Sequence, residues 1–595
     1  MRNRVHAPAV RVSGYTALLV VACVAAVLLL VAYGAWWLAS QITGTPIPGN
    51  PLLAFGYARY RDQWSPLATV FTVIAEAALL AAVVWAGRRW SQRSELEKRS
   101  VVLARPEELR EIAGASAREK AQRLRPGADL SAPGGIGLTV GTTVSGGVPV
   151  TQSWEDVAIV FAGPRTGKTQ GLAIGSILDA PGPVIATSNK RDLRDYTRGV
   201  CESRGRRVWE SDLQGITGEP HQPWWWNPLG NIDSLKSARR LAGRFVSAER
   251  VEDAKVDSYF EGGAAELLAV YFLAAAAVEG DILHAYAWLS DEENILAADL
   301  LRSAGHPIAA TKLVTAQSLH PRQRNGLYDV ARRNLNVLTE TSYVRSVLPP
   351  ARQQIPGDTT DLNDWQPTHN LPEFDPAAFV ASTDVLYALS MEGPDSASAL
   401  TTALVGRIVD EAIYRARRSP GGRLPTPMVP VLDEAANVAK LSELPDWYSH
   451  IGSQGICAQV FLQSPAQAAQ VWSPKQLDKL ISAANIHYYG GGVKDTDYLN
   501  DLSQHIGNHD VQRWSTSHAH HGVSHSQSWS AELAMPVSVL ASMPKDKAIV
   551  LSTGNRPALL RKAFWSDRPD AAEIGASYEK YGPAEETVAL TKEAS

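Results

Sequence analysis

One eight-residue turn constrains the fold of this sequence more than any other feature. The segment AGPRTGKT, Ala162 to Thr169, follows the apolar run DVAIVFA and precedes the apolar helical start QGLAIGSIL. It matches the phosphate-binding P-loop pattern, with Ala162 where the first glycine often stands. A buried strand, a glycine-containing turn and a helix in this order let backbone N–H groups cradle phosphate oxygens at the start of the helix. The segment therefore predicts a nucleotide-binding α/β domain.

The positions of this turn have predicted roles in binding ATP and Mg²⁺. Gly167 lets the backbone approach the phosphates closely, and Lys168 is expected to reach the β- and γ-phosphates. The Thr169 hydroxyl is expected to bind Mg²⁺. The predicted nucleotide-binding residues are Gly163, Pro164, Arg165, Thr166, Gly167, Lys168 and Thr169.

Two later apolar runs end in polar residues that complete a predicted catalytic set. MVPVLDEAAN delivers Asp433 and Glu434 to a strand end. We expect Asp433 to hold Mg²⁺ through water and Glu434 to polarise the attacking water; the alternative is an ordinary acid pair at a helix N-terminus. Gln463 ends ICAQVFLQ and is interpreted as a γ-phosphate sensor, or else as an exposed turn residue. The predicted catalytic residues are Lys168, Asp433, Glu434 and Gln463, and the predicted metal ligands are Thr169 and Asp433.

The apolar runs predict a parallel sheet. They are continuous rather than alternating, which is typical of strands covered on both faces. We therefore expect an α/β fold, a RecA-like P-loop NTPase domain, interrupted by an all-α insertion with helical periodicity throughout. The predicted strands lie at 156–162, 183–188, 384–390, 428–434, 456–463, 485–491 and 547–553.

The N-terminal region carries two apolar runs long enough for transmembrane helices, at about 15–39 and 66–86. A cleaved signal peptide is the alternative for the first run, although its apolar stretch exceeds the usual length. Lysine and arginine precede the first run and follow the second, whereas the loop between them holds only Arg59 and Arg61. The positive-inside rule then predicts a two-pass protein of the inner or plasma membrane, with both termini and the bulk of the chain cytosolic.

These features predict a domain order along the chain. Residues 1–90 form the membrane domain and 91–137 a stalk or linker. The nucleotide-binding domain comprises 138–234 and 347–567, and the all-α domain 235–346. Residues 568–595 are expected to be a polar, disordered tail.

A histidine- and serine-rich stretch near residues 505–525 is interpreted as a flexible polar loop, with metal binding as the alternative. Its histidines are His505, His509, His518, His520, His521 and His525.

Composition excludes some function classes. The formal net charge of −4 argues against a passive DNA binder coated with basic surface, but not against local contacts in a channel. The three cysteines have no paired spacing, so a disulfide framework or a cysteine zinc site is not expected.

Several motifs in order resemble the TraG/TraD family of type IV coupling proteins. From Leu138 to Asp567 the matching pieces are AGPRTGKTQG, IATSNKRDL, WNPL, VLDEAAN, FLQSPAQ and YYGGGVKDTDYLNDL. The resemblance implies a hexameric ATPase that couples a processed DNA–protein substrate to a type IV secretion or conjugation channel. Its implied partners are single-stranded, relaxase-bound DNA, relaxosome proteins and components of the channel, and its all-α domain would help to recognise the substrate.

One departure from the family pattern concerns arginine. Many members place an arginine just before the glutamine-tipped strand, but no arginine occurs here between Arg423 and Arg513. Arg556 and Arg561 are candidates for a residue that completes a neighbour's site; alternatively, both form surface salt bridges.

Two other functions remain open at the level of sequence. One is a double-stranded DNA translocase of the chromosome-partitioning type. The other is an adaptor for protein substrates with little ATP turnover.

Overall fold

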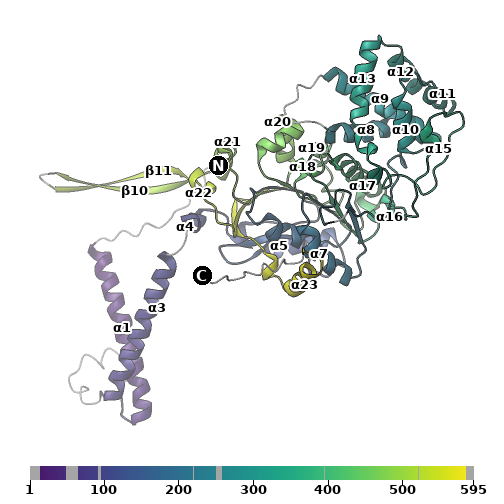
Figure 1. Ribbon diagram of the computed structural model, residues 1–595. Coiled ribbons are helices and arrows are strands. Elements are labelled where there is room, and N and C mark those ends of the chain that lie inside the picture. The colour runs from purple at the N-terminus through teal and green to yellow at the C-terminus, as the bar shows by residue number, and fades with distance from the viewer. Residues whose placement is uncertain are drawn as a thin grey trace, which may run out of the picture. The chain divides into compact units, whose positions relative to one another are not determined.

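The chain divides into two compact units. The computed structural model describes residues 14–47, 64–91, 95–218, 220–249, 258–393, 395–519 and 522–583 (Figure 1). One unit comprises Leu103–Ile506 and Met535–Ser595, and the other comprises Met1–Val102 and Gly507–Ala534.

The larger unit is built on an eleven-stranded sheet whose parallel part confirms the predicted fold class. The strand order is β2-β1-β13-β12-β9-β3-β8-β7-β4-β6-β5. All seven predicted strands lie in this sheet and are buried because helices cover both faces. The parallel strands are β3 (Ala158–Phe161), β4 (Val184–Ser188), β5 (Val208–Asp212), β6 (Val385–Leu389), β7 (Val429–Leu432), β8 (Gln459–Leu462) and β9 (Ile486–Tyr489).

An antiparallel extension continues the sheet beyond β9. The strand β12 (Lys547–Ser552) pairs with β9, with Ile549 opposite Tyr489. It is followed across the sheet by β13 (Ala558–Arg561), β1 (Leu138–Thr143) and β2 (Pro149–Gln152). Because β12 runs against β9 and β13 runs against β12, the C-terminal end of β13 lies at the same edge as the ends of β3 and β9.

The segment before β1 belongs to this unit rather than to a separate stalk. It contains η3 (Pro106–Glu108) and α5 (Gly114–Leu124). Leu109 and Ile112 are buried in the main hydrophobic core. The charged composition of this segment predicted a stalk, but the apolar side chains between the charges pack against the sheet and make the segment part of the larger unit.

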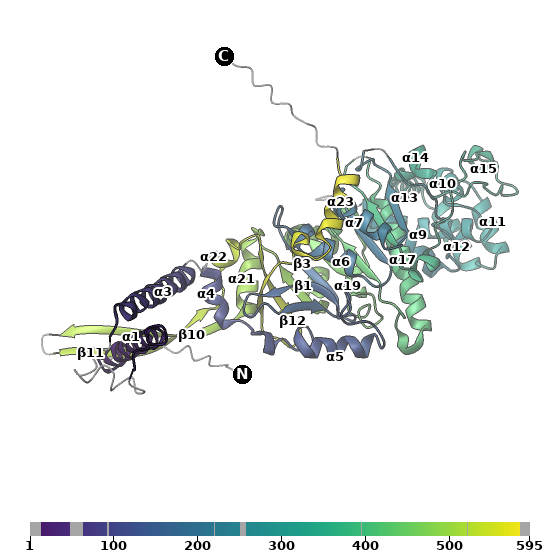
Figure 2. The same ribbon diagram turned by 90° about the horizontal axis from the view of Figure 1, so that it is seen from below.

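The expected polar tail begins with a docked helix. Helix α23 (Ala571–Tyr581) packs on α7 (Asp192–Ser203), as Figures 1 and 2 show. Ser577 Oγ accepts a hydrogen bond from Gly199 N at 2.9 Å and donates to Asp195 O at 2.7 Å. The prediction of a disordered tail is therefore wrong for this helix, which also buries Ile574 in the main core and stacks Tyr578 on Tyr196 with ring centroids 4.4 Å apart. Residues 584–595 lie outside the described part of the chain.

The described residues between 235 and 346 form helices and no strand. A long apolar helix, α9 (Ser258–Ala276), lies at the centre, and its segment Tyr259–Ala276 is long and apolar enough to span a membrane. That segment is 56% buried inside the unit, as expected for a core helix. The surrounding helices are α8 (Leu235–Glu249), α10 (Ile282–Ser290), α11 (Leu296–Ser303), α12 (Pro307–Gln317) and α13 (Pro321–Arg333), followed by α14 (Thr341–Val344).

The smaller unit holds two apolar helices that pack on each other. They are α1 (Gly14–Thr43) and α3 (Pro66–Ser91). Trp36, Ala39 and Ala68 are buried between them, and the rings of Trp36 and Trp64 lie 5.1 Å apart. By length and composition Val24–Thr43 could cross a membrane, whereas the described apolar part of α3, Pro66–Ala82, is shorter.

The histidine-rich stretch forms a hairpin, so the expectation of a flexible loop is wrong. Strands β10 (Asn508–Ala519) and β11 (Gly522–Leu533) pair in register from Asn508↔Leu533 to Ala519↔Gly522. Valine and tryptophan, which both strands contain, and threonine, which β10 contains, favour strand structure. His505 lies on the preceding helix, α21 (Thr496–Ile506), and His509 near the start of β10. The side chains of His518, His520, His521 and His525 lie outside the described residues.

Candidate functional site

The predicted P-loop connects β3 to a helical turn. Residues 162–168 leave β3 and enter η4 (Thr169–Ala173), which continues as α6 (Ile174–Asp179). Arg165 and Gly167 have φ angles of 59° and 81°. Successive right- and left-handed residues turn backbone N–H groups toward one side and make an anion-binding concavity. Gly167 supplies one left-handed position without the steric cost that a Cβ would carry.

The loop is fixed by close contacts with the glycine-rich segment after β9. Gly163 N donates to Gly491 O at 2.9 Å, and Thr166 Oγ1 donates to Gly163 O at 2.8 Å. A Cβ added to Gly163 would lie 2.1 Å from Gly492 O, so no larger residue fits without moving one of the loops. The sequence singled out this glycine segment as a motif but gave it no role.

The structure brings the four predicted catalytic side chains together at the ends of three adjacent strands. Lys168 Nζ lies 3.2 Å from Asp433 Oδ1 and also contacts the Glu434 carboxylate directly. Gln463 Nε2 donates to Glu434 Oε2 at 2.8 Å. Lys168 follows β3, the two acids follow β7, and Gln463 follows β8, which lies between those strands. This is the edge of a parallel sheet at which α/β proteins bind ligands.

Glu434 has a strained backbone as well as these contacts. Its φ of 53° places a bulky residue in the left-handed region. The next residue begins the short helix α18 (Ala435–Val438). Thr187 Oγ1, at the end of the neighbouring strand β4, donates to Asp433 O at 3.1 Å and supports the preceding peptide. Such strain persists where the surroundings hold it, and it concentrates at functional sites.

The three charged side chains of this cluster depend on one another. Burial opposes the charged form of Lys168, but attraction to Asp433 and Glu434 outweighs it and raises the pKa of the ammonium. Burial, together with the nearby Glu434 charge, raises the pKa of Asp433, and Lys168 partly offsets this rise. The lysine thus stays charged at neutral pH and balances two acids in a site of low exposure.

The residues near the loop suit one hard cation that takes few protein ligands. Thr169 supplies a hydroxyl at the start of the helix, and Asp433 supplies a carboxylate that is 4% exposed. Among the described residues no group of three or more histidines, cysteines or acids could hold a metal by itself. Mg²⁺ fits this pattern because it binds through one or two protein oxygens and completes its shell with phosphate and water.

The two candidate arginines lie at opposite ends of β13. Arg556 precedes the strand, and its Nη1 lies 3.2 Å from Glu108 Oε1 in a partly exposed ion pair. Arg561 ends the strand with an exposed side chain, at the same edge as the P-loop. The salt-bridge alternative therefore applies to Arg556, while Arg561 lies exposed at the P-loop edge of the sheet, on a strand that β12 and β9 separate from β3.

Two family models match this chain. One, described as type IV secretory system conjugative DNA transfer, matches residues 104–318. The other, described as the TraM recognition site of TraD and TraG, matches residues 427–545. The chain belongs to the TraG/TraD family of coupling proteins. The matched segments include the P-loop, the acid pair and the glycine segment, and together they cover more than half of the sequence.

The chain is similar to several solved structures. The plasmid coupling protein TrwB in complex with the ATP analogue ADPNP is 17% identical over 75% of this chain and 92% of that chain, with a TM-score of 0.50. The unbound monoclinic form of bacterial TrwB is 18% identical, covers 77% and 94%, and has a TM-score of 0.47. VirB4 of Thermoanaerobacter pseudethanolicus is 11% identical, covers 73% and 98%, and has a TM-score of 0.43. No curated protein sequence matches this chain.

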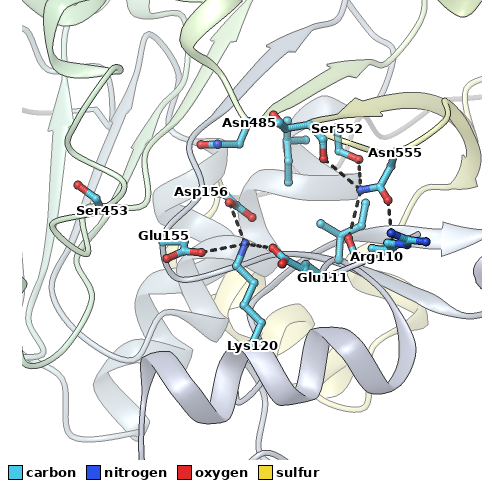
Figure 3. Close-up of a pocket in the computed structure, with 12 residues that line it drawn as sticks. Arg110, Glu111, Lys120, Glu155, Asp156, Ser453, Asn485, Ser552 and Asn555 are labelled. Carbon is cyan, nitrogen blue, oxygen red and sulfur yellow. Dashed lines mark hydrogen bonds and ion pairs between the residues drawn. The ribbon is translucent and has the colours of Figure 1, made fainter. Parts of the chain in front are cut away.

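A polar pocket lies at the edge of the sheet opposite to the P-loop. Its volume is about 280 Å³, and its lining includes residues that precede β3 and β9 and residues at the end of β12 (Figure 3). Asn555 accepts from Arg110 N at 2.7 Å and donates to Ser552 Oγ at 3.1 Å. The polar groups of the pocket thus pair with one another. These hydrogen bonds hold the segment before β1 against the sheet.

Lys120 is the centre of that pairing. Its Nζ lies 3.1 Å from both Glu111 and Glu155 and 3.4 Å from Asp156 (Figure 3). Burial opposes its charge, but the three acids outweigh this and raise the pKa of the ammonium. The lysine therefore stays protonated at neutral pH and fastens α5 to the turn before β3.

Replacing Lys120 by methionine is expected to destabilise the larger unit by about 3 kcal/mol, because it leaves buried Asp156 beside two other acids. This expected loss of stability is at the low end of the range for a broken buried ion pair, because Glu111 is largely exposed. Thermal unfolding of the purified chain measures the effect. The matched control is Arg123→Met, whose exposed contact with Glu155 is worth less than about 0.5 kcal/mol. Equal melting temperatures for both variants would contradict the role given to Lys120.

Proposed function

We propose that this TraG/TraD family member is a membrane-anchored ATPase that couples a processed DNA–protein substrate to a type IV secretion or conjugation channel and powers DNA transfer. The observation that carries the proposal is the convergence of Lys168, Asp433, Glu434 and Gln463 at one edge of a RecA-like sheet. Conjugative DNA transfer is also the function for which one of the matching family models is named.

The proposed chemistry assigns one task to each side chain. Lys168 and the loop N–H groups bind the β- and γ-phosphates of ATP and stabilise the charge that develops on them. Glu434 accepts hydrogen bonds from the attacking water and orients it, and Gln463 fixes the Glu434 carboxylate while sensing the γ-phosphate. Thr169 and Asp433 would hold Mg²⁺, which neutralises phosphate charge when bound. TrwB structures with ADPNP and with ADP and Mg²⁺ support these ligands.

The proposed cargo is single-stranded DNA attached to a relaxase, moved through a hexameric ring. Many family members carry an arginine that can complete a neighbour's site just before the glutamine-tipped strand, and this chain has none there. Arg556 or Arg561 of a neighbouring subunit is therefore the candidate for that role. Relaxosome proteins and the secretion channel are the proposed partners on the two sides of the ring. The predicted domains, including an all-α domain at 235–346 that meets the substrate, are part of this proposal.

The proposed anchor is the pair of helices α1 and α3 in the inner or plasma membrane. Their apolar surfaces and the asymmetry of lysine and arginine support two passes, with both termini cytosolic. Reporter fusions test the arrangement. A fusion after residue 50 is expected to read periplasmic or extracellular and one after residue 100 cytosolic. A cytosolic signal from residue 50 would rule out the two-pass model.

ATP hydrolysis by the purified full-length chain in detergent, with and without DNA, tests the proposed function. The proposal predicts turnover that single-stranded DNA stimulates more than duplex DNA does. A chromosome-partitioning translocase would instead respond more strongly to duplex DNA. An adaptor for protein substrates would show little turnover under any of these conditions, and that result would reject the proposal.

A further inference from the structure

A buried lysine lies behind the P-loop. Lys562 directly follows β13 and is 2% exposed. Its Nζ donates to Thr166 O at 2.7 Å and to Gly490 O at 2.8 Å. One ammonium group therefore joins the P-loop, the segment after β9 and the end of the antiparallel extension.

The contact with Thr166 determines the orientation of a neighbouring donor. A peptide unit is planar and trans, so its carbonyl oxygen and its N–H point in opposite directions. Lys562 binds Thr166 O from the buried side of the loop. The N–H of Gly167, in the same peptide unit, then faces the outer side, where the phosphates of a nucleotide would lie.

The contact with Gly490 links the P-loop to the glycine segment 490–492, which packs closely against the loop. A Cβ added to Gly492 would lie 2.4 Å from Thr166 Cγ2, and one added to Gly490 would lie 2.9 Å from the Ala162 Cβ. The P-loop and the glycine segment thus touch along their length. An ammonium that bridges their carbonyls holds this contact closed and satisfies two buried acceptors.

We propose that Lys562 is a second cation of the phosphate site, a positioning residue that holds the P-loop in its nucleotide-binding shape and adds positive charge behind it. The inference rests on the proposed function only in taking a nucleotide as the ligand. Lys168 contacts the two acids that follow β7 on the nucleotide side of the loop, whereas Lys562 contacts carbonyl oxygens on the buried side. The two lysines therefore make separate contributions to binding a negatively charged phosphate.

The surroundings of Lys562 make its contribution depend on pH. Burial lowers the pKa of its ammonium to about 8, and attraction to Asp546 offsets part of the effect. The other charged or titratable groups on β9, β12, β13 and the P-loop are His487, Tyr488, Tyr489, Lys547, Arg561, Arg165 and Lys168.

A bound nucleotide favours the charged form of Lys562, so the lysine's pKa is higher in the complex. The full contribution to affinity is therefore present below pH 8 and is lost as pH rises through the pKa of the complex. A rise of about one pKa unit in the complex corresponds to about tenfold weaker affinity at high pH.

Binding of MgADP to the full-length chain in detergent tests the proposal. Isothermal titration calorimetry in buffers of different ionisation enthalpy should show proton uptake by the unmodified protein at pH 8.5. Its affinity should fall about tenfold between pH 7 and pH 9.5. Lys562→Met should bind at least about tenfold more weakly at pH 7, without proton uptake. Lys562→Arg keeps the charge and donors, so it should restore part of the affinity and show no such fall.

The matched control is Lys547→Met, which removes another buried lysine whose Nζ bonds Asp546 on the same part of the sheet. It should leave MgADP affinity at pH 7 unchanged. Unaltered affinity in Lys562→Met, or an affinity of the unmodified chain that is constant up to pH 9.5, would overturn the role of Lys562. Failure of the unmodified chain to bind MgADP would instead reject the proposed function itself. If Lys562→Met does not fold, the pH profiles of the unmodified chain and Lys562→Arg decide the question.

Discussion

Lys168→Ala is expected to lower ATP turnover by about 10³-fold, because it removes a charged donor to the transferring phosphate. The structure adds a second cost. Without the ammonium, the Asp433 and Glu434 carboxylates face each other in a buried site with no positive charge between them. The variant should therefore bind nucleotide more weakly as well. Lys479→Ala, an exposed lysine on α20 (Pro465–Ala483), is the control and should keep the activity of the unmodified chain.

Glu434→Gln should separate binding from turnover at the same site. Glutamine keeps the shape and can still pair with Gln463, but it cannot accept a proton from water. Nucleotide binding should remain, while turnover should fall by about 10²- to 10⁴-fold. Steady-state hydrolysis and binding of a fluorescent ATP analogue measure the two quantities. Activity near that of the unmodified chain in either Lys168→Ala or Glu434→Gln would overturn the assignment of the site.

Arg561→Ala is also expected to lower turnover strongly. As the γ-phosphate leaves, its charge must be neutralised, and an arginine from a neighbouring subunit can be worth about 10³-fold in turnover. Arg561 lies exposed at the P-loop edge, whereas Arg556 lies at the far end of the same strand and pairs with Glu108. Arg556→Ala is therefore the matched control, and its exposed ion pair should cost little.

Mixed rings test whether Arg561 acts on a neighbour. A subunit with Arg561→Ala and one with Glu434→Gln are each inactive alone, but one kind of interface between them holds both intact residues. We expect mixing to recover part of the turnover. If Arg561→Ala lowers turnover by less than tenfold, or if mixed subunits recover none, the arginine that completes the site lies elsewhere.

The sequence predicted the parallel part of the sheet because its strands are continuous apolar runs bounded by turns. It missed β5, since only Val208 and Trp209 there are apolar. Glu210 of that strand is buried and forms an ion pair with Arg194, in which Arg194 Nε lies 3.0 Å from Glu210 Oε1. A tertiary contact of this kind, between side chains 16 residues apart, leaves no local pattern. Periodicity therefore predicts strands stabilised by apolar burial but not those stabilised by buried ion pairs.

The sequence predicted the catalytic cluster on the nucleotide side of the P-loop, but it did not predict the contacts of Lys562 on the buried side. Lys168, Asp433, Glu434 and Gln463 each follow an apolar run, so their meeting at one sheet edge could be expected from the order of parallel strands. Lys562 instead reaches the P-loop from an antiparallel strand whose place in the sheet depends on pairings far apart in sequence. The glycines at 490–492 were visible as a motif, but only the fold shows that they lie against the loop.

Movement of the protein along single-stranded DNA tests the central claim most directly. The full-length chain in detergent, supplied with ATP and Mg²⁺, can be followed as it reaches the fluorescently labelled end of strands of increasing length. We predict a delay before the signal that lengthens with the strand, and no signal with Glu434→Gln. Hydrolysis without a length-dependent delay, or movement that Glu434→Gln leaves intact, would contradict the account of a DNA motor driven from this site.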